Sequence, residues 1–102
     1  MDEVQSILEK NEVVIFYISR PDWSVCHALA PKVEQILKNY PEIRPVHINA
    51  CELPTIAERF MVFSAPAILL FLERKEVMRK AGIISMNELE HEVFKIYNAY
   101  YN

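Results

Sequence analysis

Short apolar runs separated by amphipathic segments predict the strands of this protein. Positions 13–18, Val-Val-Ile-Phe-Tyr-Ile, are too few for a helix and rich in β-branched side chains, so we expect a central strand. Positions 67–72, Ala-Ile-Leu-Leu-Phe-Leu, predict a strong buried strand, with positions 77–81 as its partner. At 44–48, polar and apolar residues alternate, which predicts one more strand.

Apolar residues spaced three or four positions apart predict helices. These cover residues 2–10, 25–39 and 85–100, and a shorter helix with a proline in its first turn is expected at 53–60. Pro31 falls inside the second helix. An interior proline removes a hydrogen bond, but the apolar spacing continues past it, so we expect a kink rather than an end.

The expected order of elements is α-β-α-β-α-β-β-α. A helix joins the strands at 13–18 and 44–48, and a crossover of this kind implies parallel pairing. The charged turn at 73–76 is short, so the last two strands should form an antiparallel hairpin. The sequence therefore predicts an α/β fold in which a central mixed β-sheet is flanked by helices on both faces.

Composition limits the class of protein. The chain has 102 residues, 52% of them hydrophobic and 25% charged, which suits one globular domain over residues 1–102. A net charge of −3 without a Lys/Arg cluster argues against nucleic acid and anionic membranes as partners. No apolar run approaches the roughly 20 residues that span a bilayer.

The N-terminus and the cysteines indicate a compartment. Met1-Asp2-Glu3 is acidic, and no apolar segment of a signal peptide follows it. Cys26 and Cys51 lie 25 positions apart and do not form a disulfide framework. We therefore expect a reducing, cytoplasmic environment.

The stretch from Trp23 to Pro31 carries the candidate chemistry. Cys26 lies between a predicted strand and a predicted helix, close to the N-terminus of that helix. Free backbone N–H groups and the helix dipole favour an anion at such a place. A thiol there loses its proton more easily, and the thiolate is the reactive form.

This stretch resembles the active-site segment of the thioredoxin family, in which a strand leads to a Cys-x-x-Cys loop and a helix with a proline five residues after the second cysteine. Cys26 and Pro31 have that spacing, so Cys26 matches the second, resolving cysteine. Trp23 then stands where the first, attacking cysteine would be, and the motif reads Trp-x-x-Cys. An alternative alignment with a one-residue deletion puts Ser24 at that position. In both alignments the attacking nucleophile is absent.

Two further matches support the resemblance. The family has an X-Pro peptide in the cis form just before the strand that begins the hairpin, and Ala65-Pro66 precedes positions 67–72 here. Gly82 matches a glycine that ends the last strand. The resemblance implies that the Ala65-Pro66 bond is cis and lies beside the active-site loop, with backbone groups free to pair with an extended substrate. It makes Trp23, Ala65 and Pro66 the candidate substrate-binding residues.

The family also places a buried carboxylate on the strand beneath the site, where it moves protons. The matching position is Phe16 or Tyr17, depending on where a gap is placed, so neither alignment supplies an acid. Dithiol exchange needs one thiol to attack and another to resolve the mixed disulfide. With Trp23 at the first position an internal disulfide cannot form, so we expect at most a thiol–disulfide oxidoreductase-like activity and no efficient dithiol reductase.

Three interpretations of Cys26 stay open. It is an inert buried residue, as free cysteines often are, or a monothiol that forms mixed disulfides, or a metal ligand together with His27. Adjacent helical residues point in different directions and no third ligand is near in the sequence, so we expect no metal and no cofactor. Cys51 follows the second strand, and a Cys26–Cys51 disulfide is conceivable at short distance. His47 has no partner motif.

These residues lead to competing hypotheses of function. The first is a thioredoxin-like protein with an altered active site, a weakened or monothiol thiol–disulfide redox protein with Cys26 as its catalytic residue and a protein or low-molecular-weight thiol as its partner. The alternative is a non-catalytic module that holds a peptide or protein in a groove of Trp23 and Pro66. A third is a scaffold with no site at this edge. Tyrosines crowd near the C-terminus and leave a homodimer contact open: Tyr97, Tyr100 and Tyr101.

Overall fold

The computed structural model describes residues 3–20, 24–62 and 66–101, and the side chains of residues 24–27 are outside the description. The elements follow the predicted order, with boundaries that differ by one or two residues. They are α1 (Glu3–Lys10), β1 (Val13–Ser19), α2 (Ser24–Leu37), β2 (Arg44–Asn49), α3 (Pro54–Arg59), β3 (Ala67–Leu72), β4 (Lys75–Ala81) and α4 (Met86–Tyr101).

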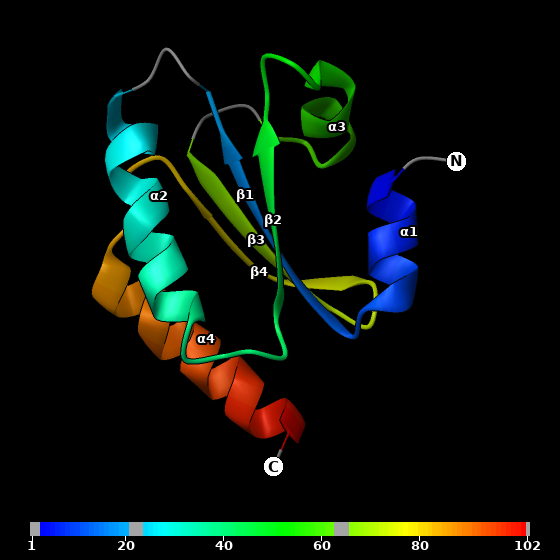
Figure 1. The fold of residues 1–102 in the computed structure, drawn as a ribbon, viewed down its shortest axis with the longest axis vertical. Helices are drawn as coiled ribbons and strands as arrows, with labels where there is room; N and C mark the ends of the chain where they lie inside the picture. Colours follow the sequence, from blue (N-terminus) through cyan, green and yellow to red (C-terminus); the bar gives the residue numbers. More distant parts are fainter. Residues whose placement is uncertain (1–2, 21–23, 63–65, 102) are drawn as a thin grey trace.

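The strands form one mixed sheet in the order β2-β1-β3-β4. β1 pairs with β2 in parallel and with β3 in antiparallel orientation, and β3 and β4 form an antiparallel hairpin. The predicted α/β fold with a central mixed sheet is confirmed. In Figure 1 the ends of β1 and β2 and the beginning of β3 lie together at the upper end of the sheet.

Helices cover both faces of the sheet (Figure 1). Successive side chains of a strand point to opposite faces. β1 therefore supplies Ile15 and Tyr17 to a core under α2 and α4, and Phe16 and Ile18 to a core against α1 and α3. Every residue of β1 is buried, which explains why its sequence is an uninterrupted apolar run rather than an alternation.

α2 continues through Pro31, as predicted. Beyond the proline the helix buries Val33 and Ile36 against the sheet, and this packing stabilises its second half. The kink expected at Pro31 stays a prediction.

The β3–β4 hairpin is tighter than predicted. β4 begins at Lys75, opposite Leu72, so the turn consists of Glu73 and Arg74 alone rather than of residues 73–76. Both turn residues have positive φ, 46° and 71°. A two-residue turn with this backbone matches the twist of its flanking strands. The sequence predicted the whole charged run as the turn, but Lys75 and Glu76 belong to β4.

Candidate functional site

The candidate site lies at the edge of the sheet where β1 and β2 end and β3 begins (Figure 1). The strand register puts Ile18, one residue before the end of β1, opposite Ala67, the first residue of β3. The segment after β2 is tied to the same edge, because the N–H of Ala50 donates to the carbonyl of Ser19 at 2.8 Å. Segments that are far apart in the chain therefore meet here.

α2 begins close to this edge and contains Cys26 as its third residue. The N–H groups of the first helical turn have no partner within the helix, and the helix dipole favours a thiolate there. The backbone position of Cys26 thus agrees with the sequence analysis. Trp23 and the side chain of Cys26 lie outside the described residues, as does that of His27, so the roles expected for them stay predictions.

Pro66 is fully buried and immediately precedes β3. Its carbonyl accepts the N–H of Gly82 at 2.9 Å. Gly82 has a φ of 75°, a conformation that glycine adopts at little cost, and it follows the last residue of β4 as expected. Ala65 lies outside the described residues, so the cis Ala65-Pro66 bond and its contact with Trp23 stay predictions.

The structure decides which residue of β1 faces α2. Tyr17 belongs to the core under α2, whereas Phe16 packs on the opposite face, with its ring centroid 5.0 Å from that of Phe60 and 5.5 Å from that of Phe71. Of the two positions that the alignments left open, Tyr17 is therefore the one on the face of α2. Only 6% of Tyr17 is exposed. A buried phenol therefore lies on this face of the sheet.

A polar pair at this edge was not predicted. Ser19 Oγ and His47 Nε2 are hydrogen-bonded at 2.6 Å, and the His47 ring lies 5.0 Å from that of Tyr17, centroid to centroid. Ser19 is buried, so its hydroxyl needs such a partner. No local pattern in the sequence signals this contact. It depends on the parallel register that puts His47 opposite Tyr17, and this register is visible only once the sheet is assembled.

Cys51 is exposed, and its thiol is free in the structure. Its N–H donates to Oδ1 of Asn49 at 2.9 Å, and the preceding residue is bonded to Ser19, so Cys51 lies at the same edge of the sheet as the candidate site. The side chain of Cys26 is not among those that the structure describes, so the distance between the two sulfur atoms is not known. A Cys26–Cys51 disulfide therefore stays a hypothesis.

The tyrosines at the end of α4 contact one another and nearby carboxylates. The rings of Tyr97 and Tyr101 lie 4.7 Å apart, centroid to centroid. The hydroxyl of Tyr97 donates to Glu42, and that of Tyr100 donates to Glu12 at 3.2 Å. These contacts within one chain give the tyrosines a structural role, and the homodimer contact stays a prediction.

In residues 3–20, 24–62 and 66–101, no group of three or more His, Cys, Asp or Glu side chains could hold a metal ion. Over the same ranges, none of the helices has the length and apolar character needed to cross a membrane.

Sequence comparison relates the chain to thioredoxins over most of its length. The family model described as Thioredoxin matches residues 2–95. The thioredoxin-like protein YdfQ of Bacillus subtilis is 34% identical over 97 residues, which cover 95% of this chain and 87% of that protein. Thioredoxin 1 of Chlorobaculum tepidum is 29% identical over 94 residues, which cover 90% of this chain and 93% of that protein.

Solved structures have the same fold. Thioredoxin 1 of Thermosipho africanus superposes with a TM-score of 0.81 at 26% identity, over 87% of this chain and 99% of that chain. Thioredoxin O2 of Arabidopsis thaliana superposes with a TM-score of 0.84 at 18% identity, over 93% of this chain and 87% of that chain, which shows the fold alone. Sequence and fold therefore agree that this chain belongs to the thioredoxin family and is a thioredoxin-like redox protein.

Proposed function

We propose that this chain acts as a monothiol member of the thioredoxin family, in which Cys26 exchanges with disulfides of a protein or a low-molecular-weight thiol. The observation that supports this proposal is the place of Cys26 in the first turn of α2. Trp23 lies three residues before it, where the resemblance to the family would put the attacking cysteine. A single thiol at a helix N-terminus can form a mixed disulfide, but it cannot close an internal one.

The proposed exchange uses the thiolate of Cys26. Its sulfur attacks one sulfur of a disulfide R–S–S–R′, a bond forms between Cys26 and R–S, and R′–S⁻ leaves and takes a proton from solvent. A low-molecular-weight thiol then attacks the mixed disulfide, carries R–S away as a new disulfide and releases the Cys26 thiolate. This second thiol comes from solution, because no cysteine stands three residues before Cys26.

Tyr17 bears on the rate of this exchange. The dithiol members of the family have a carboxylate beneath the site to move a proton, and this chain has the buried phenol of Tyr17 on that face of the sheet. We therefore expect proton transfer to rely on solvent or on the exchanging thiol. This makes turnover slower than in a dithiol enzyme.

A second candidate function is the binding of an extended peptide without chemistry. It is favoured by the burial of Pro66 at the start of β3, on the edge where β1 ends. The carbonyl of Pro66 already accepts the N–H of Gly82, so an incoming strand would have to pair with the backbone of Ala65. Trp23 would add an aromatic contact. This hypothesis does not require a reactive Cys26.

Monothiol exchange can be tested with oxidised glutathione and two single-cysteine variants. Cys51→Ser leaves Cys26 as the only thiol and Cys26→Ser leaves Cys51, so each variant is the matched control of the other. Mass spectrometry after short incubations from pH 6 to pH 8 measures the mixed disulfide. We expect the Cys26 thiol to react faster at pH 6, because the helix N-terminus keeps more of it as thiolate. Equal or slower reaction than at Cys51 would contradict the proposal.

The missing attacking cysteine can be tested with Trp23→Cys. With dithiothreitol as electron source and a disulfide-bonded protein as substrate, we expect no efficient turnover by the unmodified chain and partial turnover by Trp23→Cys. Adding Cys26→Ser should abolish that gain. Robust turnover by the unmodified chain that is lost in Cys26→Ser would show that one thiol suffices. If Cys51→Ser also abolished this turnover, Cys51 would be the resolving partner. Peptide capture that survives Cys26→Ser would favour the binding module.

A further inference from the structure

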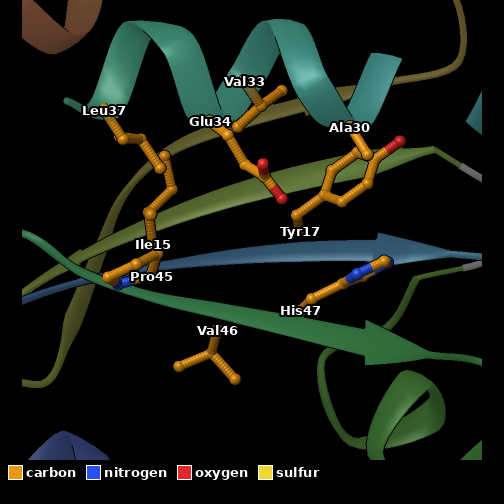
Figure 2. A pocket seen from close by; sticks show the side chains of 9 residues that line it. All are labelled: Ile15, Tyr17, Ala30, Val33, Glu34, Leu37, Pro45, Val46 and His47. Atoms are coloured by element: carbon orange, nitrogen blue, oxygen red, sulfur yellow. The ribbon is translucent and has the colours of Figure 1, made fainter. Parts of the chain in front are cut away.

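A cavity of about 340 Å³ lies between α2 and the strands β1 and β2 (Figure 2). We propose that this cavity binds a small organic cation, a protonated amine carried by an apolar aliphatic or aromatic body. Its volume falls in the range of roughly 300–1,000 Å³ that is usual for ligand pockets. Of the residues that line it, only Tyr17 enters the account of thiol exchange given above, and it does so as a residue that moves no proton. The proposal therefore does not rest on the function proposed above.

One end of the cavity is apolar. Leu37 extends from α2 toward Ile15 of β1, and Pro45 of β2 lies beside them (Figure 2). Val46 also lines the cavity, but its side chain points away and packs against the core on the opposite face, so β2 contributes backbone at this position. An aliphatic or aromatic body that enters this end is removed from water, which stabilises the bound state.

Glu34 gives the cavity a negative charge. Its side chain extends from α2 toward the ring of Tyr17 (Figure 2). Within the part of the chain that the structure describes, no ion pair and no side-chain hydrogen bond engages this carboxylate, not even with Lys38 one helical turn further on. A carboxylate without a counter-charge beside an apolar cavity attracts a cation and repels an anion.

The end of the cavity opposite Leu37 is aromatic. Tyr17 and His47 lie there, with ring centroids 5.0 Å apart and ring planes inclined by 42°. The hydrogen bond of His47 Nε2 with Ser19 Oγ, at 2.6 Å, holds the imidazole in place. Aromatic faces attract organic cations, and groups already held in place lose little freedom when a ligand binds. The ammonium group would therefore lie between Glu34 and these rings, with the apolar body directed toward Ile15.

The proposal can be tested by NMR titration of the full ¹⁵N-labelled chain with three probes of the same shape. They are 4-phenylbutylamine, the neutral 4-phenylbutanol and the anionic 4-phenylbutyrate. We expect the amine to shift the amide signals of Glu34, Leu37 and His47 with a dissociation constant on the order of 1 mM, as is usual for a ligand of this size. The alcohol should bind more weakly, and the carboxylate more weakly still.

Two variants, together with a third as control, separate the contribution of the charge from that of the cavity. Glu34→Gln should weaken binding of the amine by roughly threefold, the size of an exposed ion-pair contribution, and leave binding of the alcohol unchanged. Glu58→Gln, which removes an exposed carboxylate from α3 on the opposite face of the sheet, is the matched control and should change neither. Ala30→Leu, which fills the cavity from α2, should abolish binding of all three probes.

Equal affinity for the amine and the carboxylate would overturn the proposal, as would shifts confined to residues outside the cavity or no binding at millimolar concentration. A loss of amine affinity in Glu58→Gln as large as that in Glu34→Gln would overturn it too. The comparison of the three probes on the unmodified chain is decisive even if Ala30→Leu does not fold.

Discussion

Replacing Gly82 with alanine should lower the free energy of unfolding by about 1 kcal/mol, although the added methyl group meets no obstacle. Gly82 has a φ of +75°, and a Cβ built on it has no heavy atom within 4 Å. Steric overlap with neighbouring residues therefore contributes nothing. The backbone cost of holding an L-residue in the left-handed region is roughly 1–2 kcal/mol, and the reduced freedom of the unfolded chain offsets about 0.4–1 kcal/mol of it.

The assay is urea unfolding followed by circular dichroism, together with thermal unfolding. A loss of about 1 kcal/mol should lower Tm by roughly 4–8 °C in a domain of this size. Gly82→Asn should cost less, because asparagine tolerates positive φ, and Gly82→Val should cost more, because its β-branched side chain does not. The alanine variant keeps the N–H that donates to the carbonyl of Pro66, so this hydrogen bond should persist.

Three results would refute this reasoning. A neutral Gly82→Ala would show that the left-handed backbone is not required after β4. A loss above about 3 kcal/mol would show that the methyl group meets atoms where the structure has open space, because the backbone term alone does not reach that size. Equal costs for asparagine and valine would show that φ is not the cause.

The remaining predictions concern the hairpin turn and the tyrosines of α4. Glu73→Asn combined with Arg74→Gly should raise the free energy of unfolding by about 1 kcal/mol in urea, because both positions have positive φ and Asn-Gly is the preferred pair there; no gain would contradict this assignment. The hydrogen bond to Glu42 raises the pKa of Tyr97 to about 12, above its ordinary value of 10.0, so the stabilisation is present below pH 10 and is lost as the pH rises toward 12. Tyr97→Phe should remove a late-ionising phenol from the ultraviolet titration and flatten the loss of stability between pH 10 and pH 12. Loss of a phenol that ionises near pH 10 would count against the bond.

Local patterns in the sequence were sufficient to predict most of the fold. The unbroken apolar run of β1 predicted a central strand, because a strand that is covered by helices on both faces has no exposed side for polar residues. The apolar spacing on both sides of Pro31 predicted a helix through the proline, and the structure has one. The strand before Cys26 and the helix after it predicted its place in the first helical turn. Each of these features depends on residues close together in the chain.

The contacts between distant segments were decided only by the tertiary structure. The sequence left either Phe16 or Tyr17 for the position beneath the site, depending on where a gap is placed, and only the assembled sheet shows that Tyr17 faces α2. The bond between Ser19 and His47 joins residues 28 positions apart, through a register that no local pattern encodes. The cavity beside Glu34 arises in the same way, from the distance at which α2 packs over β1 and β2. Periodicity specifies which side of an element is buried, whereas the residue that it meets there depends on strand register and helix placement, which are properties of the whole packed chain.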